Sequence, residues 1–175
     1  LYFSADVGHS VSATAVGFFG VNYDRKVVLL DTLYYSPEGK VDKMATDDLS
    51  KNVHEFIERM YAKYGKPISN MTMDSAEAAL RNQYHKDFGV DWHPIAKLKK
   101  PDMIDRVQNL LAQGRFYYLP TENNLDKFIE EHKRYQWDEK TLHAEKPEVI
   151  KVADHTCDNF QYFVLDNEDV LDLAW

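Results

Sequence analysis

Four aspartates in this sequence have the type and position that metal or acid–base chemistry needs: Asp6, Asp74, Asp154 and Asp158. Hard divalent cations prefer carboxylate oxygens to thiolates. Acids from distant parts of a chain can therefore form a metal site if the fold brings them to one place. The elements around each aspartate decide whether this is expected.

Asp6 lies in the first predicted strand, residues 1–8. Side chains alternate between the two faces of a strand, so Tyr2, Ser4 and Asp6 share one face. The next segment, 11–21, is apolar and leaves such a strand little contact with water. A carboxylate there is costly unless it is paired or coordinates a cation. Asp6 is therefore the first residue that we expect to take part in chemistry.

Asp74 follows the short predicted strand 70–73 and precedes a predicted helix. One interpretation is an N-cap, with Glu77 three residues later completing a capping box. The other is a carboxylate at the end of a central strand, where open α/β sheets bind ligands. The two interpretations are compatible only if one carboxylate oxygen stays available.

Asp154 and Asp158 are four residues apart and share one face of a predicted helix, where two acids repel each other unless a cation lies between them. We expect Asp154 to face solvent near the helix start, where the helix dipole favours a negative charge. Asp158 is expected to lie deeper. His155 has three interpretations: a ligand, a proton carrier or a buried, hydrogen-bonded side chain.

Basic residues gather in one stretch and just beyond it: Lys97, Lys99, Lys100, Arg106 and Arg115. One interpretation is a solvated helix start and loop. The other is contact with phosphate groups of a nucleic acid.

Apolar periodicity and turn signals divide the chain into short elements. The predicted strands are 1–8, 11–21, 26–35, 70–73, 91–97 and 115–119. The predicted helices are 46–64, 75–88, 101–113, 124–135 and 147–165. Three antiparallel strands followed by alternating helices and strands predict an α/β fold with a mixed sheet flanked by helices. We expect one domain over residues 1–165 and an acidic tail over 166–175.

Composition narrows the class of protein. The chain has 175 residues and a 44% hydrophobic fraction, which is typical of one globular domain. Its net charge of -8 argues against a strong stand-alone nucleic-acid binder. The single cysteine, Cys157, excludes an internal disulfide framework and favours a reducing, cytosolic setting.

Several motifs are missing from the sequence. No apolar run approaches the roughly 20 residues that cross a bilayer, and no signal-peptide pattern opens the chain. The Gly65-Lys66 pair lacks the second glycine and the Ser/Thr of a phosphate-binding loop, so no ATPase is expected in this chain. The chain opens in a predicted strand without a methionine, which favours a piece of a longer protein.

Five motifs, in order along nearly the whole chain, resemble the nuclease domain of viral large terminase subunits. They are Asp6-Val7-Gly8, Asp74-Ser75-Ala76-Glu77, Ile104-Asp105-Arg106 with Leu110-Leu111-Ala112-Gln113-Gly114-Arg115, Tyr135-Gln136-Trp137-Asp138, and the segment from Asp154 to Tyr162. Two positions in the last motif depart from the family pattern: Asn159 and Phe160 stand where alanine and leucine or arginine are common. The resemblance implies a ribonuclease H-like fold.

The resemblance also implies an activity: hydrolysis of double-stranded DNA with little sequence specificity, which cuts concatemeric DNA during genome packaging. Two Mg²⁺ or Mn²⁺ ions would be held by Asp6, Asp74 and Asp158, with Asp6 bridging them. His155 and Asp154 are further catalytic candidates. The basic residues named above would contact the DNA backbone.

The resemblance implies partners and a location as well. These are the N-terminal ATPase domain of the same full-length protein, the portal and the small terminase subunit, in the host cell cytoplasm during virus assembly. No membrane partner and no secretion are expected.

Two other functions compete with this one. A different ribonuclease H-like nuclease, of the resolvase or transposase type, would prefer branched DNA. A catalytically inactive docking module would keep the fold, with the acids only capping and solvating it, and Mn²⁺ would not raise its thermal stability.

Overall fold

The structure, a computed structural model, describes residues 1–8, 12–40 and 44–173. Its strands are β1 (Tyr2–Asp6), β2 (Thr14–Val21), β3 (Val27–Tyr35), β4 (Asn70–Asp74), β5 (His93–Ile95) and β6 (Phe116–Tyr118). Its α-helices are α1 (Thr46–Tyr64), α2 (Ala78–Phe88), α3 (Lys100–Ala112), α4 (Glu130–Arg134), α5 (His155–Asp166) and α6 (Glu168–Leu171). A π-helix, η1 (Asn124–Ile129), and a 3-10 helix, η2 (Glu139–Thr141), complete the elements.

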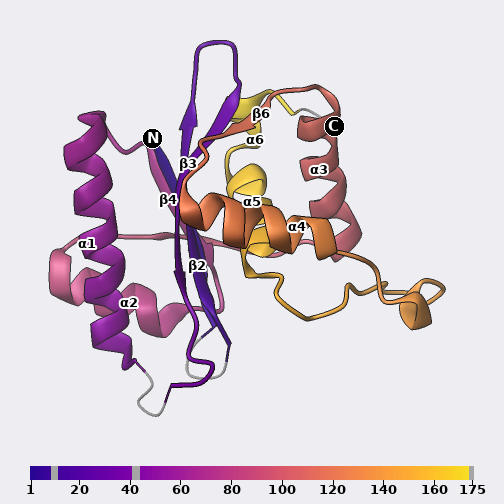
Figure 1. The fold of residues 1–175 in the computed structure, drawn as a ribbon, viewed down its shortest axis with the longest axis horizontal. Helices are drawn as coiled ribbons and strands as arrows, with labels where there is room; N and C mark the ends of the chain where they lie inside the picture. Colours follow the sequence, from indigo (N-terminus) through magenta and orange to yellow (C-terminus); the bar gives the residue numbers. More distant parts are fainter. Residues whose placement is uncertain (9–11, 41–43, 174–175) are drawn as a thin grey trace.

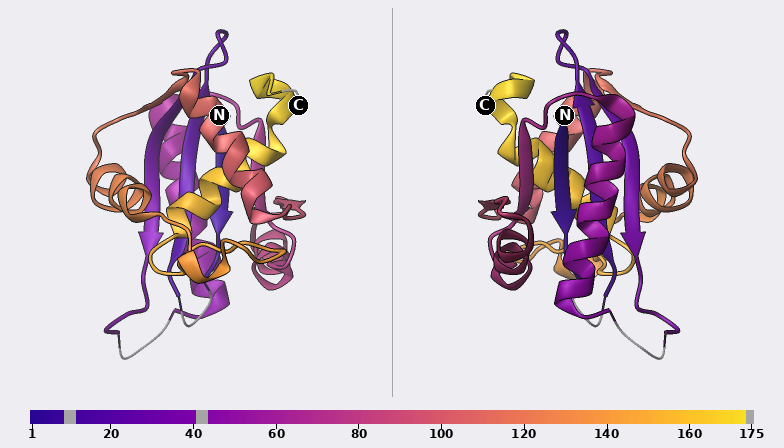
Figure 2. Two further views of the ribbon diagram at one scale, coloured as in Figure 1. Left: turned by 90° about the vertical axis from the view of Figure 1, so that its right-hand side faces the viewer. Right: turned by 90° about the vertical axis from the view of Figure 1, so that its left-hand side faces the viewer.

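The strands form one mixed sheet in the order β5-β4-β1-β2-β3-β6. β2 pairs antiparallel with both β1 and β3, whereas β4 pairs in parallel with β1, β5 with β4 and β6 with β3. Helices α1 and α2 cover one face of the sheet and α3, α4 and α5 lie on the other (Figures 1 and 2). The predicted α/β class, three antiparallel strands followed by alternating helices and strands, is confirmed.

The two faces of β1 pack against different layers. Phe3 stacks on Phe18 and meets Phe56 of α1 edge-on. On the other face, Ser4 Oγ donates a hydrogen bond of 2.7 Å to the carbonyl oxygen of Asn159 in α5. Because Asp6 alternates with Ser4, its side chain points toward α5 as well.

Helix α5 begins eight residues later than the sequence predicts, so the predicted start at Pro147 is wrong. Val149 forms an isolated antiparallel bridge with Trp137, which holds this segment extended. Ala153 has a φ of +48°, outside the right-handed helical region, so a helix cannot continue through this residue. Asp154 therefore stands at the N-cap position and His155 is the first helical residue.

The acidic segment after α5 packs against the domain. Leu171 and Leu173 are buried in the apolar layer between the sheet and α3. Glu168 forms an ion pair with Arg106, and the Arg115 guanidinium donates to the carbonyl oxygen of Leu171. In the described parts of the chain, every helix is too short or too polar to cross a membrane.

Candidate active site

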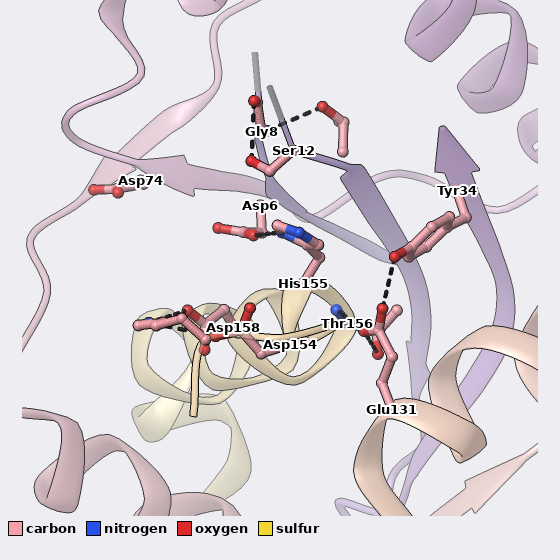
Figure 3. Close-up of polar contacts among 12 residues, drawn as sticks. Asp6, Gly8, Ser12, Tyr34, Asp74, Glu131, Asp154, His155, Thr156 and Asp158 are labelled. Atoms are coloured by element: carbon pink, nitrogen blue, oxygen red, sulfur yellow. Dashed lines mark hydrogen bonds and ion pairs between the residues drawn. The ribbon is translucent and has the colours of Figure 1, made fainter. Parts of the chain in front are cut away.

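Three strand and helix ends meet at one edge of the sheet. Asp6 is the last residue of β1, and Asp74 is the last residue of the parallel neighbour β4. In the β1–β4 pairing, Ala5 lies opposite Met73, so the two aspartates end adjacent strands at the same level. The first turn of α5 brings Asp158 beneath Asp6, whereas Asp74 lies to one side (Figure 3).

Asp6 and His155 form a largely buried pair. The Nδ1 atom of His155 lies 2.8 Å from Oδ2 of Asp6, and the two side chains are 16% and 15% exposed. Burial raises the pKa of Asp6, and the nearby charge of Asp158 adds to this, although the hydrogen bond from His155 opposes it. Burial lowers the pKa of His155, but the hydrogen bond and charge of Asp6 outweigh burial and leave that pKa raised.

This pair predicts a pH-dependent stability. A raised folded-state pKa means that His155 contributes its full stabilisation below its unfolded pKa, about 6.5, and loses it as the pH rises through the folded pKa. We expect His155→Gln to lower the free energy of unfolding by roughly 1.5 kcal/mol at a pH of about 5.5, the size of a charge-assisted hydrogen bond. The difference should shrink steadily above neutral pH. Urea denaturation of both proteins across the pH range measures it.

His85→Gln is the matched control. His85 Nδ1 lies at the same 2.8 Å from Asp91, but these side chains are 60% and 83% exposed. Exposed ion pairs contribute little, so this variant should show only a small change. A His155→Gln effect that is independent of pH would contradict the assignment of the pair.

Asp74 has a role other than the predicted N-cap. Its Oδ1 accepts from the backbone N–H of Ala76, and its Oδ2 lies 2.6 Å from Nζ of Lys97. Glu77, not Asp74, stands at the N-cap position of α2, so the predicted capping box is wrong. The buried Asp74 carboxylate is therefore paired with a cation at the end of a central strand.

The two acids at the start of α5 are both buried. Asp154 is 7% exposed and Asp158 is 6% exposed, so the expectation that Asp154 faces solvent is wrong. Lys151 Nζ lies 3.3 Å from Asp154 and 3.7 Å from Asp158. Lys100 Nζ lies 2.7 Å from the other oxygen of Asp158. Two lysines thus offset the repulsion between the acids.

Tyr162 lies near the carboxylates of Asp6, Asp74 and Asp158, which we call the acid cluster. Its hydroxyl donates a 3.3 Å hydrogen bond to Oδ1 of Asp6, and Nζ of Lys97 lies 5.3 Å from the centre of its ring. Burial raises the pKa of Tyr162, and the charges of Asp6, Asp158 and Asp74 raise it further. The hydroxyl therefore stays protonated and acts as a donor within the acid cluster.

Glu131 of α4 holds the start of α5. Its Oε2 accepts hydrogen bonds from the backbone N–H of Thr156 at 2.7 Å and from the Thr156 hydroxyl at 2.5 Å. Its Oε1 accepts from the hydroxyl of Tyr34 on β3 at 2.7 Å (Figure 3). This buried network fixes the residues between Asp154 and Asp158 relative to the sheet.

The structure separates the five predicted DNA-contacting residues. Lys97 and Lys100 pair with acids of the site. Arg106 pairs with Glu168, and Arg115 binds backbone carbonyl oxygens, so both arginines hold the C-terminal segment. Lys99 is exposed at the N-cap position of α3.

Sequence reasoning gave no role to three residues of this site, Lys151, Tyr162 and Glu131, although Tyr162 is the last residue of the fifth motif. Tyr162 lies four residues after Asp158, so helical spacing alone could have placed it beside that acid. Lys151 reaches the site because the segment before α5 is extended, and Glu131 reaches it because α4 packs against α5. Neither has a local signal in the sequence.

The donor atoms fit Mg²⁺ or Mn²⁺ in kind. Asp6, Asp74 and Asp158 offer oxygen ligands of the sort that these hard cations prefer. The two buried carboxylates of Asp74 and Asp158 already attract ammonium groups at 2.6 and 2.7 Å. Within residues 1–8, 12–40 and 44–173, no three acidic, histidine or cysteine side chains are yet close enough together to hold one ion. Ion binding therefore requires side chains to turn toward one another and the lysines to move.

A mixed sheet with this strand order, flanked by helices and carrying acids at the ends of β1, β4 and the start of α5, defines a ribonuclease H-like domain. The sequence matches the family described as "Terminase RNAseH like domain" over residues 6–166. The chain therefore belongs to the family of terminase RNase H-like domains.

Solved structures of large terminases share this fold. The large terminase of the thermophilic bacteriophage D6E is 20% identical with a TM-score of 0.78, and the match covers 94% of this chain and 39% of that one. The nuclease domain of the bacteriophage SPP1 large terminase, solved with bound Mn, is 15% identical with a TM-score of 0.60, covering 94% and 85% of the two chains. The HK97 bacteriophage large terminase is 11% identical with a TM-score of 0.66, covering 93% and 38%. A comparison with curated proteins gave no significant match.

Proposed function

We propose that this domain is a metal-dependent endonuclease that cleaves double-stranded DNA with little sequence specificity during viral genome packaging. One observation carries the proposal. Carboxylates from β1, β4 and α5, which are far apart in sequence, lie at one edge of the sheet and are each paired with a cationic or hydrogen-bonding partner. In a terminase RNase H-like domain, this is the arrangement expected of a hydrolase of phosphodiester bonds.

Asp6, Asp74 and Asp158 would hold two Mg²⁺ or Mn²⁺ ions. Bound there, such ions activate water and stabilise the leaving oxygen in phosphodiester hydrolysis. The SPP1 nuclease domain with bound Mn supports a divalent ion. His155 would hold the Asp6 carboxylate in place through its 2.8 Å contact, and Asp154 would anchor Lys151 beside the acids.

The length of the similar large terminases bears on the partners of this chain. The chain spans 39% of the D6E large terminase, which supports an ATPase domain in the same protein as a partner of residues 1–165. We propose the portal and the small terminase subunit as further partners, with double-stranded DNA as the substrate. The setting proposed is the host cell cytoplasm during virus assembly.

Nicking of supercoiled plasmid in Mn²⁺, in Mg²⁺ and in chelator tests the proposal. Cleavage that appears with either metal and disappears in chelator is the expected result. A folded protein that leaves plasmid intact in both metals would contradict the proposal for this chain and favour the docking module. A strong preference for branched over linear duplex would favour the resolvase type.

The lysine partners predict how the metal-free site behaves. Lys100 is 14% exposed and lies 2.7 Å from Asp158, where its ammonium group competes with a divalent ion. We expect Lys100→Gln to lower the metal-free melting temperature, because it leaves a buried charge less well paired. The same variant should bind Mn²⁺ about tenfold more tightly in a calorimetric titration, which corresponds to about 1.4 kcal/mol.

Lys99→Gln is the control for this prediction, because Lys99 is the exposed neighbour of Lys100. It should leave both the melting temperature and the Mn²⁺ affinity close to those of the parent. Equal Mn²⁺ affinities for Lys100→Gln and the parent would show that the lysine does not compete with the ion.

A further inference from the structure

A polar cleft continues from the acid cluster along the sheet edge. It has a volume of about 630 Å³ and lies over the start of β2 and the end of β3. The strand register places Tyr34, which lines the cleft, two strands away from Asp6: Asp6 pairs with Ala15 of β2, and Ala15 pairs with Tyr34 of β3. Since adjacent strands are about 4.8 Å apart, Tyr34 lies roughly 10 Å from Asp6 across the sheet. The cleft borders the acid cluster through His155, the hydrogen-bond partner of Asp6.

The lining of the cleft suits an extended anion. Lys40 and Lys151 contribute two ammonium groups to it, and Glu38 contributes one carboxylate. Nζ of Lys40 lies 4.1 Å from the centre of the Tyr35 ring, a cation–π contact that orients the side chain at the rim. The Ser36 hydroxyl accepts from the N–H of Glu38, which leaves its own proton for a ligand.

Lys151 connects the cleft to the acids. Its side chain is 59% exposed, yet its Nζ lies 3.3 Å from Asp154 and 3.7 Å from Asp158. His155, the partner of Asp6, also lines the cleft. A ligand lying in the cleft therefore reaches the groups that hold the candidate metal site.

We propose that this cleft binds the sugar–phosphate backbone of the duplex DNA substrate, with Lys40 and Lys151 contacting phosphates on the way to the acid cluster. The proposal rests on the proposed nuclease function and adds the surface that holds its substrate. Four of the basic residues predicted from the sequence are held by other contacts: Lys97 and Lys100 lie 2.6 and 2.7 Å from carboxylates, and Arg106 and Arg115 hold the C-terminal segment. Lys151 lies farther from its acids, at 3.3 and 3.7 Å, and is 59% exposed. The chain as a whole has a net charge of -8, so the two lysines give the cleft a local positive charge that favours phosphate groups there.

The salt dependence of DNA binding tests the cleft. Each phosphate contact contributes about 0.9 to the slope of log K against log salt concentration for duplex DNA. We expect Lys40→Gln and Lys151→Gln each to reduce this slope by about 0.9, measured by fluorescence anisotropy with a labelled duplex in chelator, where metal-dependent cleavage is absent. Lys63→Gln, at the exposed C-terminal end of α1, is the matched control and should leave the slope unchanged.

Lys40→Gln protects the test against indirect effects, because Lys40 contacts a ring rather than the acids. Lys151→Arg keeps the charge and should keep the slope. Folded Lys40→Gln and Lys151→Gln variants whose slopes equal that of the parent would overturn the proposal that the cleft binds DNA. If the parent protein nicks plasmid with metal in that case, the proposed nuclease function is kept and only the assignment of the cleft is rejected. A parent that neither binds duplex nor cleaves plasmid overturns both.

Discussion

Asp6→Asn is expected to lower metal-dependent plasmid nicking by more than about 100-fold, without loss of stability. Loss of a group that only supports a metal ligand already costs about 10–100-fold, so if Asp6 is the metal ligand that we propose, its loss should cost more. Asparagine keeps the shape of the side chain and removes its charge. Nicking rates of the parent and the variant at one Mn²⁺ concentration, with melting curves of both, measure the effect.

The stability half of this prediction follows from the pKa of Asp6. Burial raises that pKa, which means that folding disfavours the ionised carboxylate and favours its neutral form. A neutral amide removes this penalty above the unfolded pKa, although it weakens the contact with His155. We therefore expect a melting temperature at neutral pH that is equal to or above that of the parent.

Asp48→Asn is the control for Asp6→Asn. Asp48 lies in the exposed first turn of α1, with its carboxylate 3.9 Å from Lys51, on the opposite face of the sheet from α5. Its removal should leave nicking unchanged. Undiminished cleavage by well-folded Asp6→Asn protein would place the active site elsewhere.

Local signals account for the parts of the fold that were predicted correctly. The sequence predicts a helix from Thr46 to Tyr64 because its apolar residues recur at helical spacing and Gly65 follows as a stop. The structure has α1 over the same residues, with Gly65 in the left-handed conformation at a φ of +58°. The three antiparallel strands follow from their β-branched and aromatic runs and the short turns between them. In each case neighbouring residues determine the structure.

Tertiary contacts account for the parts that were not predicted. The apolar residues between Pro147 and Asp154 continue a helical pattern, but Val149 pairs with Trp137 and Ala153 takes a positive φ. Residues 124–135 were predicted as one regular helix, whereas the structure has the π-helix η1 before α4. There the buried Asn124 amide donates to backbone carbonyl oxygens of β3 and of the segment before η1, contacts that a helical period does not reveal.

The candidate site divides in the same way. Strand ends and helix faces indicated Asp6, Asp74 and Asp158 because carboxylates in apolar surroundings are conspicuous in a sequence. The depth of Asp154 and the cations beside each acid were not predictable, because Lys97, Lys100 and Lys151 reach the site from separate segments. Side-chain direction, not residue type, decides which lysines pair with the acids.

Glu131→Ala is expected to destabilise the protein by about 3 kcal/mol, because it leaves three donors without their acceptor: the N–H and hydroxyl of Thr156 and the hydroxyl of Tyr34. An unsatisfied buried donor costs about 1–3 kcal/mol, and Thr156 is fully buried. The lost negative charge at the start of α5 adds to the effect through the helix dipole. Urea denaturation near neutral pH measures the free energy of unfolding.

Glu130→Ala separates this network from a general effect on α4. Glu130 is the next residue along the helix, but it pairs with Lys133 at the surface, so its removal should change stability little. Because Glu131 fixes the turn that carries Asp158, Glu131→Ala should also weaken Mn²⁺ binding in a calorimetric titration, and Glu130→Ala should not. Equal stability of the two variants would mean that α5 is held at the site by its packing on β1 and β2 rather than by the Glu131 carboxylate.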